Sequence, residues 1–585
     1  MKTIYSLPKE RFKAHKTKSS FTVEKSAKKS YQNWSKGELI KEIERLKKRK
    51  KYGLVWEDKP EEVVEMCKNK LPVVKEIKNK QIITNKNKAV NLLIDGDNYN
   101  SLSVLNYTHA GKVDVIYIDP PYNTGNKDFK YNDRYVDLED GYRHSKWLSF
   151  MEKRLKLAKN LLKDAGVIFI SIDDNEMAQL KILMDNPDLF GENNFISNII
   201  WRKKRGYGRG DNLVIPQTEY ILLYAKDRNK LSFFELPISE RKLKDYKYKD
   251  SLGLYKRETL EHHTPYGGYV RKTLQYDLII SGKKIFCTTG QWLWSKERVE
   301  RELKDIIGKN RNGKEYKYLD IIKDSKGRQR AYKKIRLEEN GEVRGERPLS
   351  IIDDSEITTN SAAHEIRNLF ANRAFDFSKP RSLIKLLLKF SSSKNSIILD
   401  FMAGTGTTGQ AVMELNKEDG GNRQFILCTN NENNICTDVC YPRIKKVIEG
   451  YRNLKGEKVE GLGGNLKYFK TDFVDYNEPT DKNKKKLTDE ATEMLCIKEG
   501  TFEEVLDKKD FKIFKNNSHY TGIIFDQLAI PEFKKEIKNI KGKFSVYVFS
   551  LSDETFDEEF TDVKQKIKLS PIPEAILRVY RRIFK

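Results

Sequence analysis

An alternation of apolar, strand-like runs with a helical stretch constrains the fold of this chain most strongly. Strand-like runs occur near Leu92–Ile94, Val113–Ile118, Val167–Ile172 and Tyr220–Tyr224, and a helical pattern covers about Arg143–Leu162 between two of them. Such β–α–β alternation favours right-handed crossovers and parallel strands. We therefore predict an α/β fold with a mostly parallel sheet.

A second block of the same kind lies far along the chain. The apolar run Ile397–Leu399 leads to Asp400 and the glycine-rich stretch Phe401–Gly406, and a helix is expected directly after it. The glycines let the backbone approach a ligand closely, and the start of the helix offers free N–H groups. Many such turns only pack a helix against a sheet. We expect one α/β domain assembled from two sequence blocks that an insertion separates.

The tetrapeptide Asp119-Pro120-Pro121-Tyr122 directly follows the first-block run Val113–Ile118, so it is expected where a buried strand ends. Its carboxylate and the carbonyl before a proline can accept hydrogen bonds from an exocyclic NH2. The prolines stiffen the turn, and the tyrosine ring offers a stacking plane. These properties suit the binding of a flat, amino-bearing base. The alternative is a rigid loop with a satisfied aspartate.

Together, the tetrapeptide and the glycine-rich stretch resemble an S-adenosylmethionine-dependent amino-methyltransferase with a Rossmann-like fold. Asp-Pro-Pro-Tyr resembles the catalytic motif of the DNA adenine-N6 family, and the stretch from Phe401, matched to the pattern Phe-x-Gly-x-Gly, resembles its cofactor loop. The catalytic motif precedes the cofactor loop, and this circularly permuted order resembles the β-class. Further stretches resemble the modification (Mod) subunit of type III restriction–modification systems, from about residue 35 to the C-terminus: 96–98, 167–176, 219–226 and 463–471.

The resemblance implies a catalytic role for four residues: Asp119, Pro120, Pro121 and Tyr122. Asp119 is expected as a hydrogen-bond acceptor and proton sink, and Tyr122 is expected to stack on the base. Asn123 and Thr124 follow directly and are expected in the pocket for the target base. The cytosine-N4 family commonly has Ser in place of Asp119, so the aspartate favours adenine.

Eight residues are expected to bind S-adenosylmethionine. Glu432 follows the next apolar run and is placed to bind ribose hydroxyls, with Asn430 or Asn431 as alternatives if the strand ends earlier. By resemblance, Asp97 lies near the adenine of the cofactor and Lys379 near its carboxylate; the alternatives are a turn-capping Asp97 and a surface Lys379. The set comprises Asp97, Phe377, Lys379, Asp400, Phe401, Gly404, Gly406 and Glu432.

We expect no metal site. The adjacent pair His262-His263 points to opposite sides on most backbones, and His364-Glu365 lacks a second histidine four residues after His364, as a zinc protease would need. The acidic run Asp173–Glu176 follows a strand and is expected to cap the next helix, with a cation site as the alternative.

The composition favours a polyanionic partner. The chain has 585 residues and a formal net charge of +26, and nucleic acid is the most common polyanion; the alternative is a generally basic surface. No stretch approaches the length of a membrane span, and no apolar signal-peptide core follows Met1. We expect a cytoplasmic protein without membrane contact, associated with the nucleoid when bound to DNA.

The organisation along the chain predicts six segments. The insertion is dense in Lys, Arg and Tyr, so it is interpreted as a target-recognition domain. The segments are a basic flexible arm (1–34), an N-terminal helical region (35–89), the first methyltransferase block (90–227), the target-recognition insertion (228–365), the second methyltransferase block (366–454) and a C-terminal α/β segment for assembly or DNA contact (455–585).

The leading hypothesis is a DNA adenine-N6 methyltransferase that acts on double-stranded DNA as the modification subunit of a type III system. By resemblance, its partners are a second copy of the chain and a helicase–nuclease restriction subunit. The alternatives are a solitary adenine methyltransferase without a nuclease partner and a DNA-binding specificity subunit whose methylation is incidental.

Overall fold

The computed structural model of the chain divides into two compact units, Met1–Val55 and Trp56–Lys585. It describes residues 35–37, 39–40, 56–85, 88–206, 213–232, 234–262, 271–310, 313–370, 378–552, 554–563 and 566–584. The predicted arm 1–34, most of the predicted helix that follows it, Phe377 and His263 lie outside these residues.

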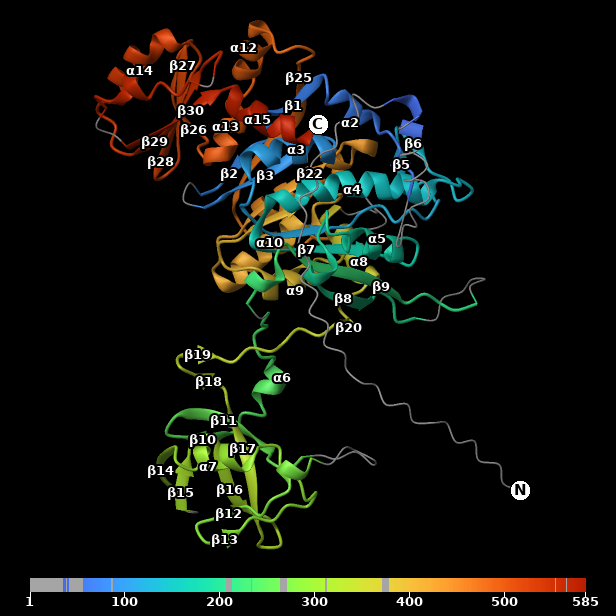
Figure 1. Ribbon diagram of the computed structural model, residues 1–585, viewed down its shortest axis with the longest axis vertical. Helices are drawn as coiled ribbons and strands as arrows, with labels where there is room; N and C mark the ends of the chain where they lie inside the picture. Colours follow the sequence, from blue (N-terminus) through green and yellow to red (C-terminus); the bar gives the residue numbers. More distant parts are fainter. Residues whose placement is uncertain are drawn as a thin grey trace. The chain divides into compact units, whose positions relative to one another are not determined.

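A mostly parallel sheet forms the centre of the larger unit (Figure 1). The strands from β25 to β7 in the spatial order are parallel, whereas β1 and β9 pair antiparallel with their neighbours. The predicted α/β fold with a largely parallel sheet is therefore confirmed. In spatial order the strands are β1 (Lys70–Glu76), β25 (Asn465–Asp475), β3 (Val90–Asp95), β22 (Gln424–Thr429), β21 (Ile397–Asp400), β4 (Val113–Ile118), β7 (Leu162–Ile172), β9 (Thr218–Ala225), β8 (Phe195–Arg202) and β20 (Ile351–Ile352), and β2 (Ile82–Ile83) pairs with β25.

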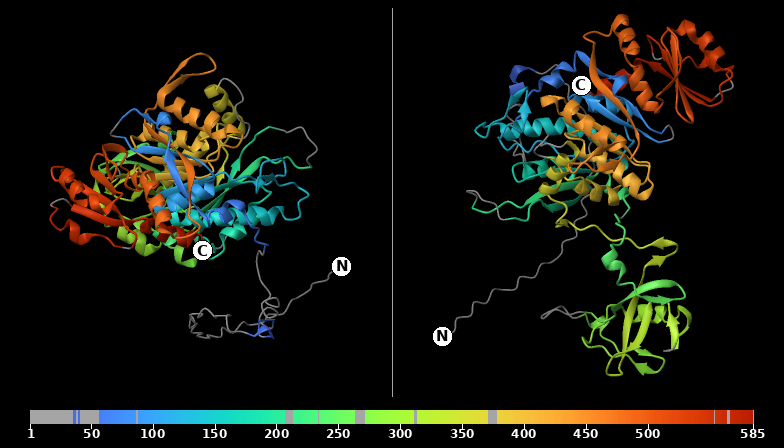
Figure 2. Two further views of the ribbon diagram at one scale, coloured as in Figure 1. Left: turned by 90° about the horizontal axis from the view of Figure 1, so that it is seen from above. Right: turned by 180° about the vertical axis from the view of Figure 1, so that it is seen from behind.

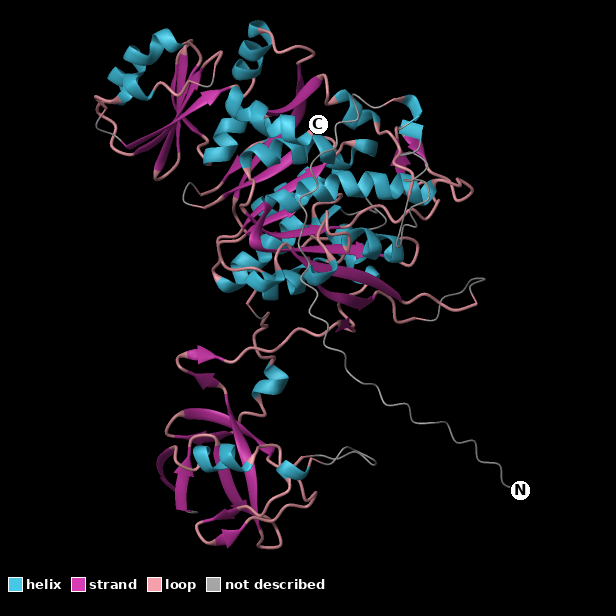
Figure 3. Cartoon of the chain, in the orientation of Figure 1, coloured by secondary structure: helices cyan, strands magenta, loops and turns pink. Residues whose placement is uncertain are grey.

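Two helix layers flank this sheet, as the cyan helices and magenta strands of Figure 3 show. In one layer α3 packs on α4 and α4 on α5, and in the other α9 packs on α10 and α10 on α11. Each layer buries apolar side chains against the strands, which are themselves buried along most of their length. The helices are α3 (Asn98–Thr108), α4 (Arg143–Leu161), α5 (Met177–Met184), α8 (Thr359–Phe370), α9 (Arg381–Ser391), α10 (Thr407–Asp419) and α11 (Tyr441–Glu449).

The predicted elements of the two blocks are found where the sequence placed them. The helix expected over residues 143–162 is α4, and the strand and helix around the glycine-rich stretch are β21 and α10. Each block alone would leave strand edges and one sheet face uncovered. Because β21 pairs with β4, residues from both blocks share one core.

Residues 35–89 are predicted to be helical, and this prediction is wrong for residues 56–85, which the structure describes. Only α2 (Glu62–Met66) is α-helical between residues 56 and 85, and β1 and β2 pair there with β25. Leu71, Val73 and Val74 supply a short apolar run with β-branched residues, which fits a pleated, buried strand better than a helix.

Two predicted segment boundaries also need correction. Residues 465–475, assigned to the C-terminal segment, form β25 inside the central sheet, where the strand pairs with β1 and β3 and its first five residues are buried. At the insertion, Leu236 and Glu346 pair through two backbone hydrogen bonds of 2.7 Å, so the neck lies inside the predicted range 228–365. β20 then returns the chain to the central sheet beside β8.

The insertion, coloured green to yellow in Figure 2, forms its own sheet. The strand order is β10-β11-β17-β16, and the core includes Trp292. Short hairpins and the helices α6 and α7 complete the described part of the insertion. Its elements are α6 (Glu240–Leu243), β10 (Tyr248–Asp250), β11 (Gly253–Thr259), β12 (Ile279–Ile280), β13 (Lys283–Lys284), α7 (Lys296–Glu302), β14 (Ile306–Asn310), β15 (Gly313–Tyr316), β16 (Leu319–Lys323), β17 (Gln329–Arg336), β18 (Glu338–Glu339) and β19 (Glu342–Val343).

The C-terminal part forms a further sheet in the order β26-β27-β28-β29-β30 with a separate apolar core. α13 and α15 connect it to the central domain, since both pack on α3. Within the described ranges, no helix is long and apolar enough to cross a membrane. The elements are α12 (Asp481–Asp489), α13 (Thr492–Glu499), β26 (Glu503–Asp507), β27 (Phe511–Lys515), β28 (His519–Ile524), α14 (Ile530–Ile537), β29 (Lys543–Phe549), β30 (Lys566–Ile572) and α15 (Glu574–Ile583).

Candidate functional site

The tetrapeptide and the glycine-rich turn lie at the same edge of the central sheet. β4 and β21 are adjacent parallel strands, and Asp119 and Asp400 stand at their carboxyl ends. The chain continues from β4 through α4 to β7 on one side, and from β21 through α10 to β22 on the other. The strand order therefore reverses between them, and open α/β sheets bind ligands in the crevice at such a point.

The tetrapeptide is held firmly, while one of its carbonyls, that of Pro120, has no donor among the described residues. The carbonyl of Pro121 accepts a 2.7 Å hydrogen bond from the indole N–H of Trp147, and the Tyr122 hydroxyl donates to Glu219 Oε2 at 3.0 Å. No described residue donates to the carbonyl of Pro120, and the Asp119 side chain is 25% exposed. The acceptors that the sequence pointed to are thus fixed at the crevice.

Asp119 belongs to a network of two carboxylates and two ammonium groups. Lys379 Nζ lies 2.8 and 2.9 Å from the two Asp119 oxygens and 3.5 Å from Glu219 Oε2. Lys203 Nζ lies 2.9 Å from Glu219 Oε1. Four alternating charges in one buried cluster neutralise one another, which favours the ionised form of each.

The pKa shifts in this cluster follow from burial and charge. Burial raises the pKa of Asp119, which Lys379 partly counteracts and Glu219 reinforces. Burial favours neutral Glu219, but Lys379 and Lys203 outweigh it and hold the Glu219 pKa below its usual value. Burial also favours a neutral Lys379 amine, yet Asp119 and Glu219 outweigh it and raise the Lys379 pKa. Lys379 is therefore the group that most strongly favours the ionised form of Asp119.

The two residues after the tetrapeptide, Asn123 and Thr124, bond to neighbouring residues of the protein. Asn123 adopts a left-handed backbone (φ 58°), and its side-chain amide donates at 2.6 Å to the fully buried Glu176, which also contacts His144. The backbone N–H of Thr124 bonds to the Asp128 carboxylate. Their contacts support the loop, and a contact of Asn123 or Thr124 with a base stays a prediction.

The glycine-rich turn has the shape of a cradle. Gly404 and Gly406 both have left-handed backbones (φ 48° and 77°), and a Cβ on Gly406 would lie 2.9 Å from Cys440 Sγ. Asp400 accepts from the Met402 N–H at 3.0 Å and from the Thr408 hydroxyl at 2.5 Å, and burial raises its pKa to about 7. The turn is therefore shaped for close approach by a ligand.

The Phe401 side chain packs in the interior of the protein. It is fully buried in the core, and two residues separate Phe401 from Gly404 where the Phe-x-Gly-x-Gly spacing allows one. The match of Phe401 to that pattern was therefore wrong by one position, which Met402 occupies instead. A backbone contact from Phe401 stays a prediction.

Arg443 anchors the cradle and was missed from the sequence. Its fully buried guanidinium donates to Thr407 Oγ1 at 2.7 Å, to Thr405 Oγ1 at 3.0 Å and to Gln410 Oε1 at 2.9 Å. Ser378 Oγ, next to Lys379, lies 3.0 Å from both threonine hydroxyls. One arginine of α11 thus joins the glycine-rich turn to the segment that carries Lys379.

The other predicted cofactor residues have well-defined partners. Asp97 caps α3 by accepting from the Tyr99 N–H at 2.7 Å, as its alternative interpretation stated. Lys379 is only 11% exposed, so the surface alternative is wrong. Glu432 pairs with Lys130 at 2.6 Å just beyond β22, and Asn431 accepts from Thr437. Their contacts with a cofactor stay predictions.

The acidic run before α5 forms a turn. Asp173 accepts from the backbone N–H and side-chain amide of Asn175, both at 2.9 Å, and Asp174 accepts from the Tyr220 hydroxyl. Glu176, at the helix N-cap, makes no side-chain cap bond there, so the expected capping of the helix is wrong for its side chain. In the described part of the chain, no three His, Cys, Asp or Glu residues are grouped to hold a metal ion.

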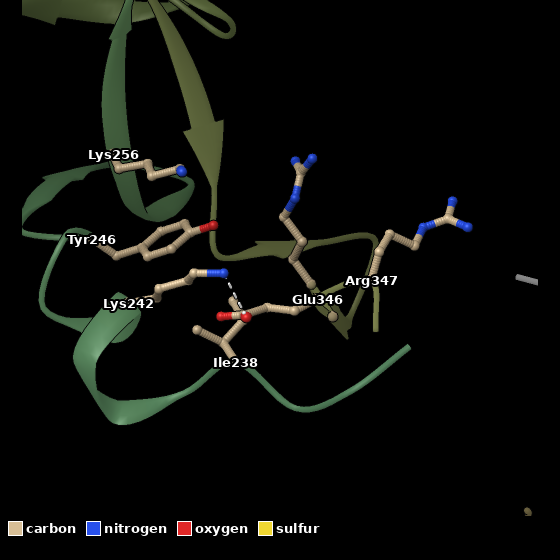
Figure 4. A pocket seen from close by; sticks show the side chains of 8 residues that line it. Ile238, Lys242, Tyr246, Lys256, Glu346 and Arg347 are labelled. Carbon is tan, nitrogen blue, oxygen red and sulfur yellow. Dashed lines mark hydrogen bonds and ion pairs between the residues drawn. The ribbon is translucent and has the colours of Figure 1, made fainter. Parts of the chain in front are cut away.

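Two cavities lie in the insertion, lined by basic and aromatic side chains. The one in Figure 4, of about 300 Å³, is at the neck: Lys242 pairs with Glu346 at 2.7 Å, and Tyr246 and Lys256 lie beside them. The second, of about 370 Å³, includes Trp294, Arg298, Tyr318 and Lys333. Arg344 lines both cavities.

Comparison with known proteins adds independent information. A family model described as DNA methylase matches residues 113–439, which includes both turns of the crevice. The chain is 36% identical over 390 residues to the Mod subunit of the type III restriction-modification enzyme StyLTI of Salmonella typhimurium, covering 61% of this chain and 55% of that protein. It is 35% identical over 398 residues to the EcoPI Mod subunit of Escherichia phage P1, covering 60% and 58%.

A third relative is covered over most of its own length. The chain is 31% identical over 399 residues to the type II methyltransferase M.KpnI of Klebsiella pneumoniae, covering 62% of this chain and 89% of that protein. By contrast, the chain spans a little over half the length of the two Mod subunits. Because the family model covers more than half of the residues and both turns of the crevice, this chain belongs to the DNA methylase family.

Proposed function

We propose that this protein transfers a methyl group from S-adenosylmethionine to N6 of an adenine that is swung out of duplex DNA. The observation that carries the proposal is the meeting of Asp119-Pro120-Pro121-Tyr122 with the glycine-rich turn at the strand-order reversal of the sheet. Membership of the DNA methylase family and the named activities of the relatives support it.

Asp119 and Pro120 would activate the target nitrogen. The lone pair of the adenine amino group is delocalised into the ring, so the nitrogen is a poor nucleophile. Asp119 and the Pro120 carbonyl would each accept one N–H, which favours a pyramidal nitrogen and stabilises the positive charge that builds on it. Once the new C–N bond has formed, the nitrogen loses a proton, for which Asp119 is the nearest acceptor or relay to water.

The cradle fits S-adenosylmethionine, which supplies an electrophilic methyl group on a sulfonium when bound. The left-handed glycines leave room for close approach, and the first turn of α10 offers N–H groups to a carboxylate. We assign the binding role to Asp400, Gly404 and Gly406, with Asp97, Phe377, Phe401 and Glu432 as further contacts. Neither alternative ribose ligand, Asn430 or Asn431, is favoured by a specific contact.

Gly406→Ala is expected to weaken S-adenosylmethionine binding about tenfold and to destabilise the domain by about 1–2 kcal/mol, because the new Cβ meets Cys440 and the backbone is strained. Calorimetric titration and thermal denaturation would measure both effects. Gly420→Ala is the matched control: its backbone is also left-handed (φ 67°), but a Cβ there meets nothing within 4 Å. Equal cofactor affinity of the two variants would contradict the cradle.

Base extrusion follows from the position of the target nitrogen, which is hydrogen-bonded inside duplex DNA. Unstacking the base costs a few kcal/mol. Stacking on Tyr122 would return about 1–3 kcal/mol. The Tyr122 ring is held in place for this purpose by its hydroxyl bond to Glu219.

The insertion is our candidate for target recognition. Its two cavities combine cations that suit phosphates with aromatic rings that suit bases. Arg344 lines both cavities, so it is the best single residue for a test.

Arg344→Ala is expected to lower duplex DNA affinity severalfold and to reduce the slope of log K against log salt by about 1, as for one lost phosphate contact. Fluorescence anisotropy at several salt concentrations measures both. Arg301→Ala removes the same charge from the same domain at a residue outside both cavities and should leave the slope unchanged. An unchanged slope for Arg344→Ala would contradict this placement.

We further infer that the protein is the modification subunit of a type III system, as a homodimer that joins a helicase–nuclease restriction subunit. Two relatives are named type III Mod subunits. The C-terminal sheet is the candidate assembly surface, and the protein would work in the cytoplasm, at the nucleoid when bound to DNA. The second candidate is a methyltransferase without a nuclease partner. Light scattering with and without a neighbouring helicase–nuclease would separate the two.

Single-molecule sequencing of DNA treated with the purified protein and S-adenosylmethionine tests the proposed activity. The expected result is N6-methyladenine at one recurring sequence. Methylated cytosine, or methylation of RNA alone, would contradict the proposal.

A further inference from the structure

Lys379 occupies the place that the proposed function reserves for the target amino group. Its ammonium lies 2.8 and 2.9 Å from the two oxygens of Asp119, and 4.8 Å from the centre of the Tyr122 ring. Asp119 is the acceptor for the base edge, and the Tyr122 ring is the platform for the base face. One cation, only 11% exposed, therefore makes two of the contacts proposed for the adenine, those with the Asp119 carboxylate and the Tyr122 ring.

A second carboxylate lies within reach of the same ammonium. Glu219 Oε2 is 3.5 Å from Lys379 Nζ, and Glu219 is fixed by Lys203 at 2.9 Å and by the Tyr122 hydroxyl at 3.0 Å. The backbone beside Lys379 is tied to the glycine-rich turn through Ser378. A rotation of the Lys379 side chain would therefore move its charge from Asp119 to Glu219 while the cofactor cradle stays in place.

We propose that Lys379 is an internal stand-in for the target amino group: it fills the Asp119 site over Tyr122 before DNA binds, and the entering base displaces it onto Glu219. The proposal rests on the proposed function and deepens it.

The physical reason for such a stand-in is that Asp119 Oδ1 is buried, although the side chain as a whole is 25% exposed. A buried carboxylate without a partner is costly, and removal of one member of a buried pair destabilises the other strongly. The charged or titratable groups that face Asp119 are Lys379, Glu219, Tyr122, Tyr117 and Asp400. Lys379 is the cation among them, so exchange of its ammonium for the N–H of the base keeps Asp119 paired throughout.

Two substitutions are expected to shift the pH dependence of methyl transfer in opposite directions. Asp119 accepts an N–H while ionised, so activity falls as the pH drops through its pKa. Lys379→Met removes the group that lowers the Asp119 pKa, so activity fails at a higher pH. Glu219→Gln removes a carboxylate that raises the Asp119 pKa, so activity persists to a lower pH, but with slower transfer because the receiving partner is lost.

The experiment measures single-turnover methylation of duplex DNA that carries the mapped site, with saturating S-adenosylmethionine, from pH about 5.5 to 9. The acid limb is the range of low pH over which the transfer rate falls from its plateau. In Lys379→Met this limb should move to higher pH by about one pH unit, so that transfer on the acid side is about tenfold lower relative to the plateau of the same variant. Glu219→Gln should move it down. Lys385→Met is the matched control, because it removes an ammonium from nearby α9 that pairs with Glu414 and Glu418 instead; its profile should match the unsubstituted protein.

Titration calorimetry distinguishes the stand-in from a cofactor ligand. The expected S-adenosylmethionine Kd of Lys379→Met lies within threefold of the unsubstituted protein. A Kd raised tenfold or more with an unmoved acid limb overturns the proposal and returns Lys379 to the cofactor carboxylate. Acid limbs that move in the same direction in Lys379→Met and Glu219→Gln also overturn it.

A readout that does not need activity separates this inference from the proposed function. Carbon-13 NMR of labelled aspartate, assigned with Asp119→Asn, follows the Asp119 carboxyl directly. If the Asp119 carboxyl titrates identically in the unsubstituted protein and in Lys379→Met, the stand-in is overturned even if methylation is observed. No methylation by the unsubstituted protein overturns the proposed function, and the stand-in with it.

Discussion

Asp119→Ala is expected to reduce methyl transfer by about a thousandfold, with duplex DNA affinity within threefold of the unsubstituted protein. Removal of one preorganised hydrogen-bonding group at a reacting centre costs about 10²–10³ in rate, and here the lost group also carries the charge that offsets the developing cation. Single-turnover kinetics and fluorescence anisotropy measure the two quantities separately.

Two further variants sharpen this prediction. Asp119→Asn keeps the shape and one acceptor oxygen but loses the charge, so its rate should fall between those of Asp119→Ala and the unsubstituted protein. Asp438→Ala removes an exposed carboxylate outside the crevice and should change neither quantity. If Asp119→Ala keeps more than a tenth of the rate, Asp119 is not the acceptor that drives the reaction.

Arg443→Met should weaken S-adenosylmethionine binding more than tenfold and destabilise the α/β domain by about 3 kcal/mol. The guanidinium is fully buried, and its removal leaves the hydroxyls of Thr405 and Thr407 without their charged donor. Hydrogen bonds to charged groups contribute about 1.5–3 kcal/mol each, and buried groups left without partners add to the loss. Burial already lowers the pKa of Arg443 to about 10, a measure of how far it is removed from water.

Calorimetric titration and chemical denaturation test the Arg443 prediction. Arg452→Met, at a more exposed arginine on β23 (Gly450–Arg452), is the control and should behave like the unsubstituted protein. Unchanged cofactor affinity and an unchanged denaturation midpoint in Arg443→Met would show that the glycine-rich turn holds its shape without this arginine.

The strands and the two turns of the site could be predicted because their signals are local. β4 and β21 are short apolar runs that end in Asp119 and Asp400, and hydrophobic period and glycine position are enough to place them. By contrast, β1 pairs with β25 across most of the chain, and no local pattern reveals such a partner. A run such as Leu71–Val74 is too short for periodicity to separate strand from helix.

The charged network of the site could not be predicted for the same reason. Lys379 and Asp119 are 260 positions apart, and Tyr122 and Glu219 are 97 apart, so only the fold brings them together. The sequence made Lys379 a cofactor ligand by resemblance, whereas the structure pairs its ammonium with the Asp119 carboxylate. Arg443 carries no motif at all, and its function depends on burial behind a turn that lies far away in the sequence.

The most direct test of the account is methyl transfer itself. Purified protein, mixed-sequence duplex DNA and S-adenosylmethionine with a labelled methyl group are incubated, and the DNA is digested to nucleosides for mass spectrometry. The account predicts label in N6-methyladenine, abolished by Asp119→Ala. Label in N4-methylcytosine, or none in DNA with Asp119 intact, would contradict it.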